Sequence, residues 1–415
     1  MTTFSARSPN LNIFHKLVLL LIIVLSAYVF SNPNSQGTWT YVYFSGAANL
    51  EFDLEWTIDR DGFEEFITLG DSEKREYTFK KAVGDDRIPY PLPLDIGYLL
   101  IIWLAQMIFF LKPIQAVIAL QVCFHAISSI WIIGRLGRIK AQLIFFLLYA
   151  VNPVVLHFVT LDYHYYWQVL PGLAWIWWVT RDHAPLKVVE AVILIVFFVF
   201  CFSIRQSTLP MSLLICGIIF WSNKNILGLA LILCFVGVVA VAKNDSQPWH
   251  TAYVGIGGYP NDIGVELSDR SGFEHFERVT GLEVKTSPVS GNWADKNFQR
   301  LYQGVMREQF FEYAVTQPEQ VLRNALLNIS QGFSVGYRTD SLILAYLSSL
   351  IGFLVAIALI ILKMRTTFFL LLSGVSGFAL FYPSVPAYMF GNYVILASTL
   401  AMIVCRLRLF KNSKD

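Results

Sequence analysis

The residues of this sequence that could do chemistry lie in three places. Asp59 and Asp61 form a compact pair of carboxylates within a long polar segment. Asp162 and His164 have the same spacing in a very short polar stretch between two apolar runs. Arg205 also lies between two apolar runs, with almost no loop around it. A carboxylate can act as general base on a hydroxyl group, Asp with His can bind a divalent metal, and a guanidinium group suits bidentate contact with a phosphate.

Each of these features also has an explanation without chemistry. An acidic segment is usually only solvated, and an arginine beside an apolar run can extend along it to the lipid headgroups. The aromatic residues around Asp162 can form an interfacial belt in a membrane, or they can stack on a sugar with Tyr166 as a substrate contact. The sequence leaves these alternatives open.

Composition places these residues in a membrane protein. Hydrophobic residues make up 55% of the chain and charged residues only 14%, and the mean hydropathy is +0.54; soluble domains carry about a quarter charged residues. Apolar runs of spanning length recur along the chain and predict an all-α polytopic membrane protein. The runs are 15–31, 94–111, 114–134, 141–159, 165–180, 188–204, 207–222, 226–242, 343–362, 367–383 and 388–405.

The placement of charge predicts the topology. The polar segments 32–93 and 243–342 hold 24 of the 29 acids but only 15 of the 31 bases, so we expect both outside the cytoplasm. The remaining bases gather in the cytoplasm only if one run does not cross. We therefore expect 94–111 to be a juxtamembrane or re-entrant helix on the outer face, with an ordinary crossing as the alternative. The prediction is about ten transmembrane helices, with both termini in the cytoplasm.

Three parts follow from this topology. We expect a membrane-embedded catalytic module over 1–242 that includes the outer loop 32–93, an outer loop with interfacial helices over 243–342, and C-terminal transmembrane helices over 343–415. All five cysteines lie inside apolar runs, so no disulfide framework is expected in the outer loops. The absence of cysteines from the outer loops and the compact size of the protein favour a bacterial inner membrane.

The two outer loops share a pattern of residues. DRDGFEEF begins at Asp59, and DRSGFEHF begins at Asp269. We predict two similar helix starts, capped by Asp59 or Asp61 in the first copy and by Ser268 or Asp269 in the second, with chance similarity as the alternative.

The second outer loop contains further candidate features. It opens with PWHTAYVGIGGYPNDIG, in which His250 and Tyr253 suggest an ordered substrate-binding loop close to the membrane. An amphipathic helix is expected over about 298–333, broken at Pro318.

In the order and placement of these features the chain resembles the GT-C superfold of membrane glycosyltransferases, in particular family 39, which use polyprenyl-phosphate sugar donors. The similarity covers most of the chain. It includes a single span, an acidic outer loop, and a proline-led segment PYPLPLDIGYLL. An NP-containing span with Asp162 just beyond it follows, and then IRQSTLPM, WHTAYVGIGGYPN and EQFFEYAVTQPEQVLRNAL. The acidic motif usual soon after the first span is missing, which leaves the identity of the base open.

The resemblance implies transfer of a sugar from a polyprenyl-phosphate donor to a hydroxyl group of a glycan, lipid or protein at the outer membrane face. No nucleic acid is implied as a partner. The roles that it carries over are general base for Asp59 or Asp61, divalent-metal ligands, where a metal is used, for Asp162 and His164, and donor-phosphate binding for Arg205 and Lys112.

Two other classes of protein are weighed against this one. An O-antigen polymerase or ligase also combines many spans with a large outer loop, but it needs several outer arginines, whereas only Arg205 stands at the end of a span. A lipid or glycan transporter would carry charges within its spans and show internal repeats, and the sequence has neither feature.

Overall fold

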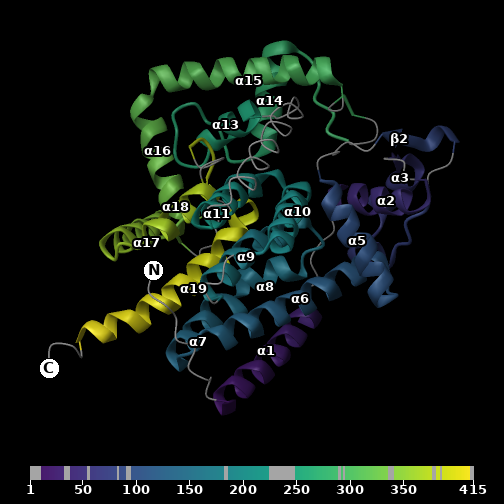
Figure 1. Ribbon diagram of the computed structural model, residues 1–415. Coiled ribbons are helices and arrows are strands. Elements are labelled where there is room, and N and C mark those ends of the chain that lie inside the picture. The colour runs from purple at the N-terminus through teal and green to yellow at the C-terminus, as the bar shows by residue number, and fades with distance from the viewer. Residues whose placement is uncertain are drawn as a thin grey trace. The chain divides into compact units, whose positions relative to one another are not determined.

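The computed structural model describes residues 11–31, 38–53, 57–81, 84–89, 95–181, 186–223, 248–287, 291–292, 295–334, 341–375, 380–383 and 386–411. The predicted span 226–242 lies outside these ranges. The described residues are 81% helical, which confirms the predicted all-α class (Figure 1). Among them, the only sheet pairs two antiparallel strands, β1 (Thr57–Asp59) and β2 (Arg87–Pro89), with Ile58 opposite Ile88.

The chain divides into two compact units. Unit 1 comprises Met1–Ile215 and Phe390–Asp415, and unit 2 comprises Cys216–Met389. The division predicted at residues 242 and 342 separates membrane segments from outer segments, whereas these two units are defined by contacts between residues. The predicted division therefore stays a prediction.

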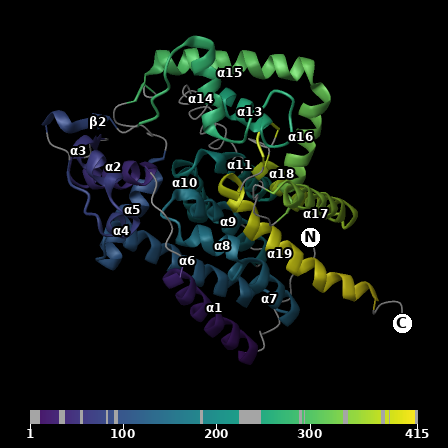
Figure 2. The same cartoon turned by 180° about the vertical axis from the view of Figure 1, so that it is seen from behind.

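Unit 1 contains most of the apolar helices. Helix α1 (Leu11–Ser31) lies beside α6 (Pro113–Arg135) and α8 (Pro153–Thr160) in both views (Figures 1 and 2). Further elements that begin in this unit include α7 (Ile139–Phe145), the π-helical η2 (Phe146–Ala150), the 3-10 helix η3 (His164–Gln168), α9 (Val169–Thr180), α10 (Val188–Ile204), the 3-10 helix η4 (Gln206–Thr208) and α11 (Leu209–Ser222).

Three of the described helices are long and apolar enough to cross a membrane. They are α6, α17 (Leu342–Ile361) and residues Ala387–Val404 of α19 (Pro386–Lys411). A fourth results if 139–150 and 153–160, which meet at an angle of 50°, form one span. The bend has a local cause, because Pro153 cannot continue the preceding helix and the Asn152 side chain accepts a 2.9 Å hydrogen bond from the Val154 N–H. Residues Ile13–Val29 of α1 and the other apolar helices found among the described residues have lengths of 10–17 residues.

The predicted juxtamembrane run 94–111 forms α5 (Ile96–Phe109). Its 14 residues extend about 21 Å, less than the roughly 30 Å of a bilayer core. One side of α5 packs on the protein, and the other exposes apolar side chains, namely Leu100, Trp103, Leu104, Met107 and Ile108. Helix α11 of the predicted span 207–222 also has 14 residues, so the position of α5 at the membrane surface stays a prediction.

The described part of the segment 32–93, which was predicted as the first outer loop, is folded rather than only solvated. Helix α2 (Thr38–Asp53), which the sequence analysis did not predict, buries Tyr41, Val42, Tyr43 and Phe44 and packs on α5 and β1. Two short helices follow, α3 (Arg60–Thr68) and α4 (Asp71–Glu76), together with the 3-10 turn η1 (Gly84–Asp86).

Unit 2 has its own core beneath a bent pair of helices. Helices α15 (Lys296–Thr316) and α16 (Pro318–Gln331) meet at Gln317, which confirms the predicted break at Pro318 (Figure 1). Helices α13 (Pro248–Ile256) and α14 (Asp269–Thr280) pack on α15, and α18 (Arg365–Val375) packs on α17. The core of these helices includes Tyr253, Phe276, Tyr302, Met306 and Phe310.

The first copy of the repeated pattern packs on a buried tyrosine. Asp59 occupies the N-cap position of α3, although its side chain makes no capping hydrogen bond. A Cβ atom on Gly62 would collide with the Tyr41 hydroxyl. The rings of Phe63 and Phe66 lie 5.6 and 5.3 Å from the Tyr41 ring, between centroids.

The second copy repeats this packing around Tyr302. A Cβ atom on Gly272 would lie 2.7 Å from the Tyr302 hydroxyl, and Phe273 and Phe276 lie 6.1 and 5.0 Å from the Tyr302 ring. The cap of α14 is Ser268, whose hydroxyl accepts a 3.2 Å hydrogen bond from Arg270 N–H, rather than Asp269. The shared pattern therefore describes one way of packing a short helix on a tyrosine.

Candidate functional site

Asp95 is the centre of the candidate site, and it precedes the first turn of α5. Its side chain is 6% exposed, and its Oδ2 accepts a 3.1 Å hydrogen bond from the Tyr43 hydroxyl of α2. The sequence analysis did not single out either residue. One signal was available: Asp95 is among the five acids outside the two long polar segments (29 in total less 24). An acid beside an apolar run is costly and usually has a partner or a function.

Close packing of α5 on α10 brings Arg205 to the same place. A Cβ atom on Gly97 would collide with Ser203 Oγ, and it would lie 2.8 Å from the Ile204 nitrogen, so only glycine permits this approach. Arg205 follows directly and is half-buried. Its guanidinium carbon lies 5.6 Å from the centroid of the Tyr165 ring, within the range of a cation–π contact.

Aromatic rings complete the cluster. His164 lies 5.4 Å from Tyr43 and 5.9 Å from Tyr98, in edge-to-face contacts between ring centroids. Tyr163 and Tyr165 are half-buried, and their rings lie 4.9 Å apart. We call Tyr43, Asp95, Tyr163, His164, Tyr165 and Arg205 the Asp95 cluster.

The charges of the Asp95 cluster act on one another. Burial raises the pKa of Asp95, while the positive charge of Arg205 and the hydrogen bond from Tyr43 oppose this rise. Burial and the charge of Arg205 together hold the pKa of His164 well below its ordinary range, so its imidazole is neutral. Neither ring nitrogen of His164 has a hydrogen-bond partner among the described residues. The cluster therefore offers a carboxylate of raised proton affinity, the positive charge of Arg205, and a neutral imidazole that can form hydrogen bonds with a ligand.

Asp162 lies in the turn between α8 and η3 and is 1% exposed. Burial raises its pKa to about 7, against the opposing effects of Thr40 and the positive charge of Arg75. Among the described residues, no three His, Cys, Asp or Glu side chains form a group that could hold a metal ion. Asp162 and His164 thus supply at most two ligands there, so the metal site stays a prediction and no step below is assigned to a metal.

The two carboxylates predicted as the base lie in different environments. Asp59 is 8% exposed, and its Oδ2 is 3.5 Å from the Tyr41 hydroxyl. Burial raises the pKa of Asp59, and the nearby acids Asp61 and Asp86 raise it further. Asp61 is exposed on α3. Neither has a contact with the Asp95 cluster among the interactions of the described residues.

Lys112 does not lie beside Arg205, although both were predicted to bind the donor phosphate. Arg205 is at the N-terminal end of α5, whereas Lys112 follows its C-terminal end, about 21 Å away along the 14-residue helix. The Lys112 amine donates a 2.7 Å hydrogen bond to Thr78 Oγ1. The structure thus separates this predicted pair.

The other predicted substrate contacts are packed inside the protein. Tyr166 is fully buried, 5.7 Å from the Phe390 ring, and Tyr253 belongs to the core of unit 2. The predicted ordered loop around His250 is helical over Pro248–Ile256. His250 contacts the Tyr302 hydroxyl through Nδ1 at 2.6 Å and Asp269 through Nε2 at 3.1 Å.

No family model, curated protein or solved structure matches this chain. The functional argument therefore rests on the residues and geometry described above.

Proposed function

We propose that the chain is an integral membrane glycosyltransferase. It moves a sugar from a polyprenyl-phosphate donor to a hydroxyl group of a glycan, lipid or protein acceptor on the extracytoplasmic face. About ten transmembrane helices and an outer catalytic face belong to this proposal. The observation that carries it is the meeting of Asp95, Tyr43 and Arg205 beside half-buried aromatic rings.

The position of the Asp95 cluster agrees with the topology predicted from charge. That topology assigns Asp95, the turn after α8 and the turn after α10 to the outer side, independently of any contact between them. The contacts of Tyr43, His164 and Arg205 join these three stretches. Their convergence supports a single site at the outer membrane surface.

The proposed reaction uses each group for one task. The acceptor oxygen attacks the anomeric carbon of the donor while Asp95 takes the hydroxyl proton, and the bond from that carbon to the phosphate oxygen breaks with inversion. The leaving polyprenyl phosphate keeps the electron pair, and Arg205 stabilises its charge. Tyr163 and Tyr165 provide a surface on which the sugar ring stacks. The Tyr43 hydroxyl orients the carboxylate and favours its ionised form.

A transfer assay tests the proposal. Membranes containing the wild type, Asp95→Asn or Arg205→Gln receive a polyprenyl-phosphate donor with a radiolabelled sugar, and incorporation into acceptor is counted at equal protein level. Loss of a general base lowers rates by about 100-fold or more, and a comparable loss is expected for Arg205→Gln. Lys112→Ala and Asp59→Asn serve as matched controls, and both retain transfer within a few-fold.

Three other results would change the assignment. Full transfer by Asp95→Asn together with loss in Asp59→Asn would move the base to Asp59. Loss in Lys112→Ala would return Lys112 to the donor site. A wild type that uses no lipid-phosphate sugar but lengthens a pyrophosphate-linked glycan would make the chain a polymerase instead.

A further inference from the structure

A surface recess lies where α6, α9 and the middle of α19 meet within unit 1. Its cavity volume is about 20 Å³, room for about one water molecule, and it opens to the outside. Its lining is mostly apolar and includes Ile132, Trp175, Ile176, Val179, Ile395 and Met402. Arg135 and Thr180, which end α6 and α9, also line it. Because α6 is one of the candidate spans, its last residue marks the level of a membrane surface.

The polar groups of this recess are incompletely satisfied. Arg135 is exposed, and within the described part of the chain its one contact is a 3.4 Å hydrogen bond from Nη1 to the Thr180 carbonyl oxygen. A guanidinium group has five N–H donors, so most of its capacity is free for an anion. Ser398 also lines the recess, is 4% exposed, and its hydroxyl has no hydrogen-bond partner among the described residues.

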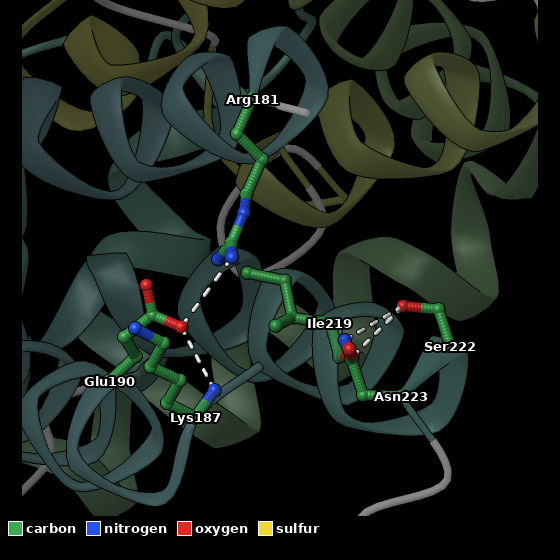
Figure 3. A network of polar contacts seen from close by, with 6 residues as sticks. All are labelled: Arg181, Lys187, Glu190, Ile219, Ser222 and Asn223. Carbon is green, nitrogen blue, oxygen red and sulfur yellow. Dashed lines mark hydrogen bonds and ion pairs between the residues drawn. The ribbon is translucent and has the colours of Figure 1, made fainter. Parts of the chain in front are cut away.

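Arg181, the residue after α9, provides a contrast. Its guanidinium carbon lies 4.8 Å from the Trp177 ring centroid, and its Nη2 is 3.4 Å from Glu190 Oε2. Glu190 also accepts a 2.9 Å hydrogen bond from the Lys187 N–H at the start of α10 (Figure 3). Figure 3 also shows how Asn223 closes α11 by donating to the Ile219 carbonyl oxygen at 2.7 Å. Among the described residues, Arg181 thus has an acidic partner, and Arg135 has none.

We propose that this recess binds an anionic phospholipid of the surrounding bilayer. The lipid phosphate binds the exposed Arg135 guanidinium at the mouth of the recess, and an acyl chain lies against the half-buried rim formed by Val179 and Met402. Basic pockets between membrane helices are suited to such headgroups. The site is separate from the Asp95 cluster, because the 12 residues of α9 and the η3 turn lie between Thr180 and His164, with α9 alone extending about 18 Å.

Native mass spectrometry of the purified full-length protein tests this site. The delipidated protein is titrated with dioleoylphosphatidylglycerol and, in parallel, with the zwitterionic dioleoylphosphatidylcholine. The wild type binds the anionic lipid more tightly. Arg135→Gln weakens that binding by about tenfold, because it removes a charge-assisted hydrogen bond, while the affinity for phosphatidylcholine changes little. Arg181→Gln is the matched control and leaves the preference intact.

A second variant separates lipid binding from folding. Met402→Trp covers the mouth of the recess from its half-buried rim and is expected to reduce binding of both lipids while the thermal unfolding temperature stays near that of the wild type. Equal affinity of the wild type for the two lipids would overturn the proposal. So would an equal loss in Arg135→Gln and Arg181→Gln, since it would indicate unspecific attraction to positive charge.

Discussion

The hydroxyl of Tyr302 lies 2.6 Å from Nδ1 of His250, and both groups face Gly272 on the neighbouring helix α14. Asp269, the first residue of the second DRxGFExF copy, contacts the other ring nitrogen of His250. In this copy, His250 therefore lies between the acid and Tyr302. In the first copy, Asp59 contacts Tyr41 directly. Both tyrosines are fully buried, which gives the repeated pattern a structural explanation.

Gly272→Ala is expected to destabilise unit 2. The new Cβ atom would lie 2.7 Å from the Tyr302 hydroxyl and 3.0 Å from His250 Nδ1, and overpacking of this kind costs about 1–3 kcal/mol. Gly304→Ala in α15 is the matched control. Nothing lies within 4 Å of its Cβ position, so replacement of a helical glycine should stabilise by about 0.5–1 kcal/mol. Thermal unfolding of the two variants measures the difference, and equal shifts would contradict the packing described here.

Gly97→Ala is expected to impair sugar transfer, although residue 97 is not proposed to contact a substrate. Its Cβ would force α5 away from Ser203 and Ile204, and with it Asp95 away from Arg205. A displacement of about 1 Å can cost about 100-fold in rate. Gly134→Ala on α6, whose nearest neighbour is a Phe14 carbon at 3.9 Å, should retain activity. The assay is the radiolabelled transfer described above, and unchanged activity in Gly97→Ala would mean that this approach does not position the site.

Tyr43→Phe is expected to shift the pH dependence of transfer. The Tyr43 hydroxyl stabilises the ionised form of Asp95 and so lowers its pKa against the effect of burial. Without the hydroxyl, the pKa of Asp95 rises further, and a base that must be ionised works only at higher pH. The acid limb of the kcat/KM profile should therefore move to higher pH while the plateau is largely kept. A profile with an unchanged acid limb would exclude Asp95 as the titrating base.

Asp162 is expected to make the protein less stable as the pH rises. Its pKa is raised from 3.8 to about 7 by burial, so the folded state favours the protonated carboxyl. The stabilisation is complete below pH 3.8 and is lost as the pH rises through about 7. Asp162→Asn cannot ionise and should flatten the decline in unfolding temperature between about pH 4 and pH 7. Thermal unfolding across that range compares the variant with the wild type, and parallel curves would contradict a buried, titrating Asp162.

Much of the helical organisation could be predicted from local signals in the sequence. The apolar runs, the break at Pro318 and the start of α14 depend on hydrophobic periodicity, a proline and a serine cap, which act within a few residues. The sequence also singled out His164 and Arg205, because charged or polar groups between apolar runs are conspicuous. The apolar run 94–111 also located the helix α5, while its position at the membrane surface, inferred from the placement of basic residues, stays a prediction.

Only the tertiary structure decided which of these residues meet. Asp95 became the centre of the site because α2 folds back onto α5 and brings Tyr43 to it, which is a contact across 52 positions in the chain. Lys112 and Arg205 looked like a pair, yet the rigid length of α5 keeps them apart. Sequence patterns report the preference of each segment for helix and for membrane. The packing of helices, here permitted at Gly97 by the absence of a side chain, determines which distant groups come within reach of one another.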